Sequence, residues 1–533
     1  MEDAVRLENI TKTFGSVVAN NNVSFSIKKG EILAILGENG SGKTTLMNMI
    51  SGIYYPDSGS IYINGEKADI HSPKAAFGYG IGMIHQHFKL VDVFTAAENI
   101  ILGMDNKAHK SKKDLYKEVE EIIEKYGFDI DPYKKIFEMS VSEKQTVEII
   151  KVLMRGADIL ILDEPTAVLT PQEIDKLFSI LKTMKEESNK AIVIITHKLN
   201  EVLEISDRVT ILRKGEYIDT VLTKDTNEQK LTEMMVGKKI DLKIDRPIIE
   251  KTKPLLEIRH LDILKDDGST AIEDVSFYIR GGEILGVAGI SGCGQKELCE
   301  GIAGLRKIKA GQIAHLGVSI IGKSAKEISE RGISMSFIPE DRLGMGLAPN
   351  FSITENMMLK NYGDAPFIFV DRNKARAEAT ALISKLDIKT PSTETPVRRL
   401  SGGNVQKVLV GREIESGPNV IITAYPVRGL DINSSYLIYN ILNQQKVKGT
   451  GILFVGEDLD VMLALCDKIM VLCHGKLMGV VKASNTTKEK LGLMMTGALN
   501  LLEVEKERNW GFAKDSNLTE EEWNKIGEDS NND

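Results

Sequence analysis

The sequence predicts an α/β protein that consists of two tandem modules, each built around a mainly parallel β-sheet. Two observations predict this fold class. Short phrases occur twice, in the same order, along the 533 residues, and a repeat of this kind indicates a duplicated module. Within each copy, short β-branched runs alternate with stretches of helical spacing. This alternation is typical of a parallel sheet, because parallel neighbours must be joined by a crossover.

The duplication is seen in three pairs of phrases, and their order and spacing persist over roughly 240 residues. We therefore expect a first module at 1–240, a charged and Pro-flanked join at 241–254, a second module at 255–500 and an acidic tail at 501–533. The paired phrases are 27–37 with 279–289, 140–145 with 401–406, and 207–212 with 467–472.

Composition argues against several classes of protein. The chain has 68 Lys and Arg against 76 Asp and Glu, a net charge of −8, so we predict no nucleic-acid partner. Four cysteines without a CxxC pair predict free buried thiols, and neither a disulfide framework nor structural zinc. We expect no signal peptide from the residues at the start of this sequence, and no apolar run approaches the roughly 18 to 20 residues that cross a bilayer. We expect a cytoplasmic chain that reaches a membrane through partners.

A phosphate-binding loop is the most specific motif of the first module. Residues 37–44 read GENGSGKT and fit GxxxxGK[ST], between an apolar strand over 32–36 and a helical stretch over 45–51. In such a loop, glycines let backbone N–H groups form an anion nest, Lys reaches the phosphates, and the Ser/Thr hydroxyl binds Mg²⁺. The predicted nucleotide-binding residues are Gly37, Asn39, Gly40, Ser41, Gly42, Lys43, Thr44 and Thr45, with Lys43 also catalytic and Thr44 also a Mg²⁺ ligand.

Two later strands end in residues that suit the same chemistry. The apolar run 159–162 leads into Asp163 and Glu164, and the run 192–196 leads into His197. Asp163 is predicted to hold Mg²⁺, Glu164 to polarise the attacking water, and His197 to contact the γ-phosphate. A solvated acidic turn and a structural histidine are the alternatives. The phosphate loop earlier in the chain favours the functional interpretation.

The order of these motifs, with Gln86 and the phrase 140–145 between them, resembles the ATP-binding subunits of ABC transporters over about residues 1–500. The resemblance implies that each module adds an antiparallel β subdomain and a helical subdomain to its sheet. It further implies ATP and Mg²⁺, with Phe14 stacked on adenine. Gln86 would be catalytic, would bind Mg²⁺ and would contact the transport partner.

The phrase SGGNVQ at 401–406 resembles the signature of that family. The resemblance implies that this helix N-terminus closes over the γ-phosphate from the opposite module, so that a tandem chain forms two composite ATP sites. The predicted contacts of the second signature are Ser401, Gly402, Gly403 and Gln406.

The second module lacks the side chains that the first module is predicted to use for phosphate and Mg²⁺ binding and for hydrolysis. Outside the phosphate loop and the acidic turn, Gln86, His197 and Phe14 are replaced by Glu340, Glu457 and Lys265. The first signature has Ser142 where the second has Gly403, and a side chain there would crowd a phosphate. Since the family pairs the first signature with the second loop, all defects fall in one composite site. We predict one hydrolytic site and one degenerate site. The main replacements are Gln295 for Lys43, Lys296 for Thr44, Ala424 for Asp163 and Tyr425 for Glu164.

Phrases in the second module resemble importers of monosaccharides and nucleosides that have a fused ATPase, and the phrase HQHF at 85–88 is similar to the nucleoside members. The resemblance implies two transmembrane permease subunits, an extracytoplasmic binding lipoprotein of the basic-membrane-protein type, and a place on the cytoplasmic face of the membrane. A monosaccharide importer is the alternative. The phrases that match this subgroup are 337–342, 400–404 and 428–431.

Other interpretations stay open at this point. Residues 85–104 and 337–360 would form the groove for permease helices, or the first of them would be a solvated loop. Soluble tandem proteins of the same family act on ribosomes or DNA, but they usually keep both sites intact and have a long basic linker. A scaffold that binds nucleotide without hydrolysis is disfavoured by Glu164.

Overall fold

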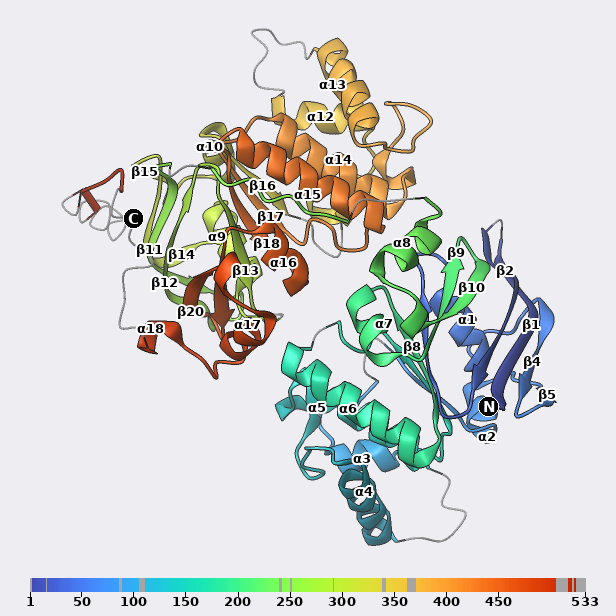
Figure 1. Ribbon diagram of the computed structural model, residues 1–533. Coiled ribbons are helices and arrows are strands. Elements are labelled where there is room, and N and C mark those ends of the chain that lie inside the picture. Colours follow the sequence, from blue (N-terminus) through green and yellow to red (C-terminus); the bar gives the residue numbers. More distant parts are fainter. Residues whose placement is uncertain are drawn as a thin grey trace. The chain divides into compact units, whose positions relative to one another are not determined.

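The computed structural model (Figure 1) divides the chain into two compact units, Met1–Asp241 (unit 1) and Leu242–Asp533 (unit 2). Among the described residues, no helix has the length and apolar character that a bilayer-spanning segment needs. The described residues are 2–15, 17–85, 89–104, 111–167, 169–238, 242–249, 252–290, 292–337, 342–361, 371–504, 516–519 and 522–523.

Unit 1 contains two sheets. A six-stranded sheet has the order β10-β9-β3-β8-β7-β6 and is parallel except for the edge strand β10, and a four-stranded antiparallel sheet has the order β2-β1-β4-β5. The strands are β1 (Asp3–Phe14), β2 (Val17–Lys28), β3 (Ile32–Leu36), β4 (Ser58–Ile63), β5 (Glu66–Ala68), β6 (Ile81–Ile84), β7 (Ile159–Asp163), β8 (Ala191–Thr196), β9 (Arg208–Arg213) and β10 (Glu216–Leu222).

The central strands of the parallel sheet are apolar along their whole length, because both faces of the sheet are covered. All residues of β3, β7 and β8 are buried. In the register, Ile35 lies opposite Ile195, and Asp163 also lies opposite Ile195 on the other side. The phosphate loop after β3 and the acidic turn after β7 therefore lie at the same edge of the sheet.

The helices of unit 1 begin at recognisable caps. Ser111, Ser140 and Thr95 each form a capping box, in which the cap side chain and an acid three residues later satisfy each other's backbone N–H. The helices α3, α4 and α5 pack together, and their residues Val119, Val147 and Ile150 share one core with residues of the parallel sheet such as Leu160 and Ile192. The helices are α1 (Lys43–Ile50), α2 (Pro73–Gly78), α3 (Ala96–Ile101), α4 (Lys112–Tyr126), α5 (Val141–Met154), α6 (Pro171–Ser188), α7 (Leu199–Ile205) and α8 (Glu228–Val236).

Unit 2 repeats this plan. Its six-stranded sheet has the order β16-β17-β18-β13-β19-β20, with only β20 antiparallel, and its antiparallel sheet has the order β12-β11-β14-β15. The strands are β11 (Pro254–Leu264), β12 (Thr270–Arg280), β13 (Ile284–Ala288), β14 (Ile308–His315), β15 (Val318–Ser319), β16 (Ile333–Phe337), β17 (Val420–Ala424), β18 (Gly451–Val455), β19 (Lys468–Cys473) and β20 (Lys476–Lys482).

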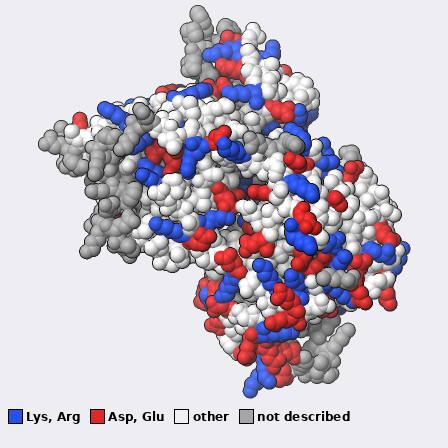
Figure 2. Space-filling model, in the orientation of Figure 1, with Lys and Arg blue, Asp and Glu red and all other residues white. Residues whose placement is uncertain are grey.

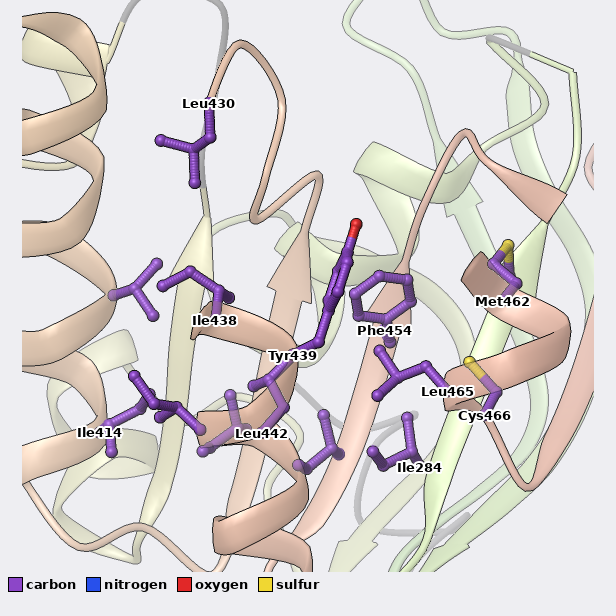
Figure 3. Close-up of a cluster of buried hydrophobic side chains, with 14 of the residues drawn as sticks. Ile284, Ile414, Leu430, Ile438, Tyr439, Leu442, Phe454, Met462, Leu465 and Cys466 are labelled. Carbon is purple, nitrogen blue, oxygen red and sulfur yellow. The ribbon is translucent and has the colours of Figure 1, made fainter. Parts of the chain in front are cut away.

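The largest hydrophobic cluster among the described residues of unit 2 lies between the six-stranded sheet and its helices. Figure 3 shows Tyr439 from α15 beside Phe454 of β18, and Ile438 and Leu442 of the same helix on the side nearer Ile414. The ring centroids of Tyr439 and Phe454 lie 6.5 Å apart. Each fully buried side chain of this size contributes about 1.5 to 3 kcal/mol. The helices are α9 (Gln295–Ile302), α10 (Ala325–Glu330), α11 (Arg342–Met345), α12 (Ile353–Asn361), α13 (Arg372–Lys385), α14 (Gly402–Glu415), α15 (Ile432–Val447), α16 (Leu459–Leu465), α17 (Lys488–Met495) and α18 (Leu501–Val504).

These sheets confirm the predicted fold class, and the predicted strands over 32–36, 159–162 and 192–196 correspond to β3, β7 and β8. The predicted helical stretch over 45–51 corresponds to α1. The four cysteines are free and buried, as expected.

The join and the tail, which lie at the two ends of unit 2, both pack on the rest of that unit. In the join, the Nη1 of Arg246 donates to the carbonyls of Leu463 and Cys466 at 3.2 and 2.8 Å. In the tail, Trp523 is 1% exposed and lies under the guanidinium of Arg259, 4.3 Å from the ring centroid. The segment of the acidic tail around Trp523 is therefore docked on the antiparallel sheet.

Candidate functional site

The phosphate loop of unit 1 connects β3 to α1 and has the backbone of an anion nest. Gly40 and Gly42 have φ of 78° and 92°, in the left-handed region that favours glycine. A Cβ on Gly42 would lie 2.3 Å from the carbonyl oxygen of Ala19. Glycine is therefore required here by both conformation and space. Asn20, which is fully buried, donates from Nδ2 to the Gly42 carbonyl at 3.2 Å and holds the loop against β2.

Lys43 lies within this loop. Its side chain is 7% exposed, and its Nζ donates to the carbonyls of Gly37 and Glu38 at 2.6 and 3.0 Å. Burial lowers the pKa of Lys43, while the nearby charges of Glu164 and Asp163 act in the opposite direction. The loop thus holds a cation beside a nest of N–H groups, which suits the phosphates of a nucleotide.

The donor groups beside this loop fit Mg²⁺ and phosphate. Thr44 is exposed at the start of α1, and its hydroxyl is hydrogen-bonded to the carboxylate of Asp163. Hydroxyl and carboxylate oxygens are the ligands that Mg²⁺ prefers. Burial raises the pKa of Asp163, and a bound cation would favour its charged form. The Oγ of Ser41 is buried and has no hydrogen-bond partner, so the loop retains an unused polar atom.

Glu164 and His197 come together from the ends of β7 and β8. Nδ1 of His197 lies 3.0 Å from Oε1 of Glu164. The hydrogen bond from His197 is the main cause that lowers the pKa of Glu164, despite its burial. The carboxylate is therefore ionised at neutral pH and able to accept a proton from a water molecule.

The structure brings together most of the predicted residues of the first site. The loop residues from Gly37 to Thr45 lie at the same sheet edge as Asp163, Glu164 and His197. Phe14 lies at the end of β1, on the hairpin whose second strand touches Gly42. Gln86 lies outside the described residues. Sequence analysis missed Asn20, because its contact depends on β2 passing beside the loop and no local pattern marks it.

The two signature helices differ at their N-termini. In α5, Ser140 and Glu143 cap each other, and Lys134 pairs with Glu143 at 2.8 Å. In α14, Ser401 makes no side-chain cap and the first turn has no acid. An anion is stabilised at a helix N-terminus, and Glu143 already supplies one to α5. The N-terminus of α14 remains available to a phosphate.

Gly403 and Gln406 have different places in α14. A Cβ on Gly403 would meet only Leu430, at 3.4 Å, so packing within unit 2 does not require glycine there. Gln406 is buried, and its Nε2 donates to the carbonyl of Pro426 at 3.2 Å. Gln145 makes the same bond to Pro165 in unit 1, at 2.7 Å. Within unit 2, Gln406 thus ties α14 to the loop after β17, and its predicted nucleotide contact stays a prediction.

The second phosphate loop keeps the backbone of the first. Gly292 and Gly294 have φ of 88° and 101°, close to the values of their counterparts. The buried Gln295 donates from Nε2 to the carbonyl of Ile290 at 3.1 Å, a bond of the kind that Lys43 makes with its loop carbonyls. Lys296 is directed to Glu300, 3.7 Å away. The nest is retained, whereas the cation inside it is replaced by a neutral amide.

The acidic turn of unit 1 has an uncharged counterpart in unit 2. Ala424 is buried at the end of β17, and burial raises the pKa of the next residue, Tyr425, to about 12. Glu457, in the place of His197, lies 3.5 Å from Nε of Arg428. At neutral pH this turn offers no carboxylate from β17 to a metal or a water molecule.

Comparison with known proteins agrees with this architecture. The model of the ABC transporter family matches residues 20–167 and 272–426. The nucleoside import ATP-binding protein NupA of Lactococcus lactis is 41% identical over 93% of this chain and 98% of its own length. The guanosine import ATP-binding protein NupO of Bacillus subtilis is 42% identical, with the same coverage. The glucose import ATP-binding protein TsgD13 of Haloferax volcanii is 38% identical over 93% of this chain and 96% of its own length.

Proposed function

Because the chain belongs to the ABC transporter family and is an ATP-hydrolysing, ATP-binding subunit of an importer of the sugar and nucleoside class, we propose that it energises nucleoside import with one hydrolytic and one degenerate ATP site. The hydrolytic site combines the phosphate loop of unit 1 with the second signature. The degenerate site combines the second loop with the first signature.

The difference between the two signature helices is the observation that carries this assignment. The N-terminus of α14 has neither a side-chain cap nor an acid, whereas that of α5 is closed by Ser140 and Glu143. This difference supports the proposal that the loop that retains Lys43 forms its composite site with the open helix end. Independent decay of two equal sites would not distribute the losses in this way.

The residues of unit 1 supply the steps of hydrolysis. The backbone nest and Lys43 bind the phosphates, and Thr44 with Asp163 would hold Mg²⁺, which neutralises the charge that develops on the phosphate oxygens. Glu164 accepts hydrogen bonds from the attacking water, and His197 keeps Glu164 ionised and oriented. Gln86 would add a further Mg²⁺ ligand, and Phe14 would supply the platform for adenine.

Two transmembrane permeases and an extracytoplasmic lipoprotein are the proposed partners, at the cytoplasmic face of the membrane. The names of NupA and NupO support a nucleoside or guanosine as the solute. The name of TsgD13 supports a monosaccharide as the second candidate. Action on nucleic acid is disfavoured by the net charge. Figure 2 shows Lys and Arg interspersed with Asp and Glu on the face in view, without a continuous basic stripe among its described residues.

Affinity purification of the full-length chain from detergent-solubilised membranes tests these partners. We expect two permeases and a binding protein to co-purify. The binding protein should then show a thermal shift with nucleosides and none with ribose or glucose. A shift with monosaccharides alone would replace the nucleoside assignment by the second candidate. Recovery of ribosomes or DNA instead of permeases would contradict the transport role.

A further inference from the structure

We propose that Asp57 is a positioning residue for the aromatic ring of Phe14, and that it thereby sets the affinity of the catalytic site for the adenine base of ATP. This inference rests on the proposed function, in which Phe14 is the adenine platform. Asp57 would act through the strand end that carries Phe14.

The Asp57 carboxylate clamps the end of β1. Its Oδ2 accepts hydrogen bonds from the backbone N and from Oγ1 of Thr13, both at 2.7 Å, and its Oδ1 accepts one from Nζ of Lys12 at 2.7 Å. Nζ of Lys12 also donates to the carbonyl of Tyr55 at 2.8 Å. The residue directly before Phe14 is thus tied to the loop that ends at Asp57.

The clamp is charge-assisted. Hydrogen bonds from Lys12 and Thr13 lower the pKa of Asp57 to about 2, so the carboxylate is ionised at neutral pH. Hydrogen bonds that involve an ionised group are roughly twice as strong as those between neutral groups. A clamp of this kind can hold a strand end even at an exposed position.

The ring of Phe14 depends on this support because it is not held by a core. The side chain is 44% exposed. Its aromatic neighbour is Tyr54, with the two ring centroids 5.3 Å apart in an edge-to-face arrangement, and Nζ of Lys12 lies 5.6 Å from the Phe14 centroid. Asp57 bonds to Lys12 directly and lies three residues after Tyr54. A shift of the clamp would therefore move the ring and its neighbours together.

The same hairpin also reaches the phosphate loop. Its second strand, β2, contributes the carbonyl of Ala19, which packs on Gly42, and the amide of Asn20, which bonds to Gly42. The turn with Phe14 and the wall of the phosphate loop are parts of one hairpin. The position of an adenine relative to its phosphates would consequently depend on how this hairpin is held.

Unit 2 provides an internal comparison. The register of β11 with β14, set against that of β1 with β4, places Lys309 at the position of Asp57 and Lys265 at that of Phe14. The carboxylate and the aromatic ring are therefore lost together. Gly59 and Gly311, with φ of 97° and 108°, show that the turn itself is kept.

The sheet of unit 2 closes without a carboxylate at this position. Nη1 of Arg306 donates to the carbonyl of Leu264 at 3.1 Å and to Asp266 at 2.9 Å. The strand end is thus held from a different residue. If the Asp57 clamp served only to close the sheet, its loss would not be expected to accompany the loss of the ring.

Nucleotide titrations of the full-length chain test the proposal, with Glu164→Gln present throughout to suppress hydrolysis. The ligands are ATP and inorganic tripolyphosphate, each with Mg²⁺. We expect Phe14→Ala to weaken ATP binding roughly tenfold, the value of one base stacked on an aromatic ring. Asp57→Ala should weaken ATP binding by about three- to tenfold and leave tripolyphosphate binding unchanged. Asp57→Asn, which keeps an acceptor oxygen, should recover part of the loss.

The double variant Asp57→Ala/Phe14→Ala should bind ATP no more weakly than Phe14→Ala alone, because the two residues act as a unit. Lys309→Ala, at the corresponding exposed position of unit 2, is the matched control and should change neither affinity. Unchanged ATP binding in Asp57→Ala, together with a loss in Phe14→Ala, would overturn the inference and leave the proposed function intact. An equal loss of tripolyphosphate binding in Asp57→Ala would also overturn it. No effect of Phe14→Ala would instead remove the adenine platform from the proposed function.

Discussion

Glu164 and Tyr425 occupy equivalent places in the two units. They share a backbone conformation although their side chains differ in chemistry. Both residues have a left-handed backbone, with φ of 48° and 53°. Both backbone N–H groups donate to the neighbouring strand, to Ile195 at 2.9 Å and to Val455 at 2.8 Å. This conformation is costly for a residue other than glycine. Because it persists in unit 2, where the carboxylate is lost, the turn is a property of the fold.

The first prediction concerns these two residues. Glu164→Gln should lower the ATPase kcat of the assembled transporter by roughly 10²- to 10⁴-fold, since it removes the group that polarises water. Tyr425→Ala should leave kcat nearly unchanged, because it alters only the degenerate site. Steady-state phosphate release measures both. A similar loss in the two variants would contradict the assignment of a single hydrolytic site.

A second prediction concerns pH and His315. This residue ends β14, is 3% exposed, and has a buried Nε2 without a hydrogen-bond partner. Burial, assisted by the charge of Arg331, lowers its pKa to about 4, from an ordinary value of 6.5. As the pH falls below 6.5, the unfolded chain takes up a proton before the folded chain does, so the free energy of unfolding decreases until about pH 4.

The expected loss of stability over this range is on the order of 3 kcal/mol. Urea denaturation at pH 7.5 and at pH 4 measures this loss, and His315→Phe should reduce the difference in the free energy of unfolding between the two pH values. His260→Gln is the control, because His260 is exposed and paired with Asp274. An unchanged pH dependence in His315→Phe would show that other groups cause it.

At the scale of elements, the equivalent helices α5 and α14 differ in how their N-termini are capped. The helices α5 and α14 both follow a short 3₁₀ turn and are both tied by a glutamine to the loop after a central strand. They differ in the first turn, where α5 has Glu143 and α14 has none. The capping box stabilises the N-terminus of α5 without any ligand. The open end of α14 gives up that stabilisation and becomes receptive to an anion.

A third prediction follows for Gly403. Gly403→Ala should change the free energy of unfolding by less than about 0.5 kcal/mol, because the added Cβ makes an ordinary contact with Leu430. It should nevertheless lower ATPase activity by roughly tenfold or more, if this helix end approaches the γ-phosphate closely. Ser142→Ala, at the equivalent position of α5, is the control and should leave activity unchanged. Full activity of Gly403→Ala would argue against the second signature as part of the hydrolytic site.

At the scale of the whole molecule, the two antiparallel sheets differ in how their outer faces are covered. In unit 1, Arg6 and Glu8 on β1 form an exposed ion pair. In unit 2, the corresponding Glu257 and Arg259 are buried, and Trp523 lies on Arg259. The tail is fixed further by Gln312, whose Nε2 donates to the Trp523 carbonyl at 2.6 Å. The tail thus belongs to unit 2, although its sequence is acidic and distant from β11.

The fourth prediction uses this difference. Each hydrophobic cluster of the described residues is formed within one unit, so calorimetry should resolve two unfolding transitions. Trp523→Ala should lower the free energy of unfolding of unit 2 by roughly 3 kcal/mol, and so shift only the transition of that unit to a lower temperature. Val447→Ala, an exposed position on α15, is the control. A shift of both transitions, or of neither, would contradict docking of the tail on unit 2.

Much of the site could be predicted because its signals are local. The nest needs glycines at fixed spacing, and a buried parallel strand is recognised by its own apolar residues. The loop over 37–45, Asp163, Glu164 and His197 could therefore be chosen as candidates from the sequence, and the structure places them at one sheet edge. The contacts of Asn20 and Asp57 could not be found in this way. Each depends on a residue far away in the sequence, and neither residue belongs to a periodic pattern.

From sequence alone, the duplication, the α/β class and the residues that meet at the sheet edge are determined, because chain direction brings the carboxyl ends of parallel strands to one edge. The folded structure was needed to show that Gln406 is buried, that Tyr425 retains the strained backbone of Glu164, and that Trp523 is enclosed. Burial and hydrogen bonding arise from segments that are distant in the chain, and a local pattern does not encode which of them meet.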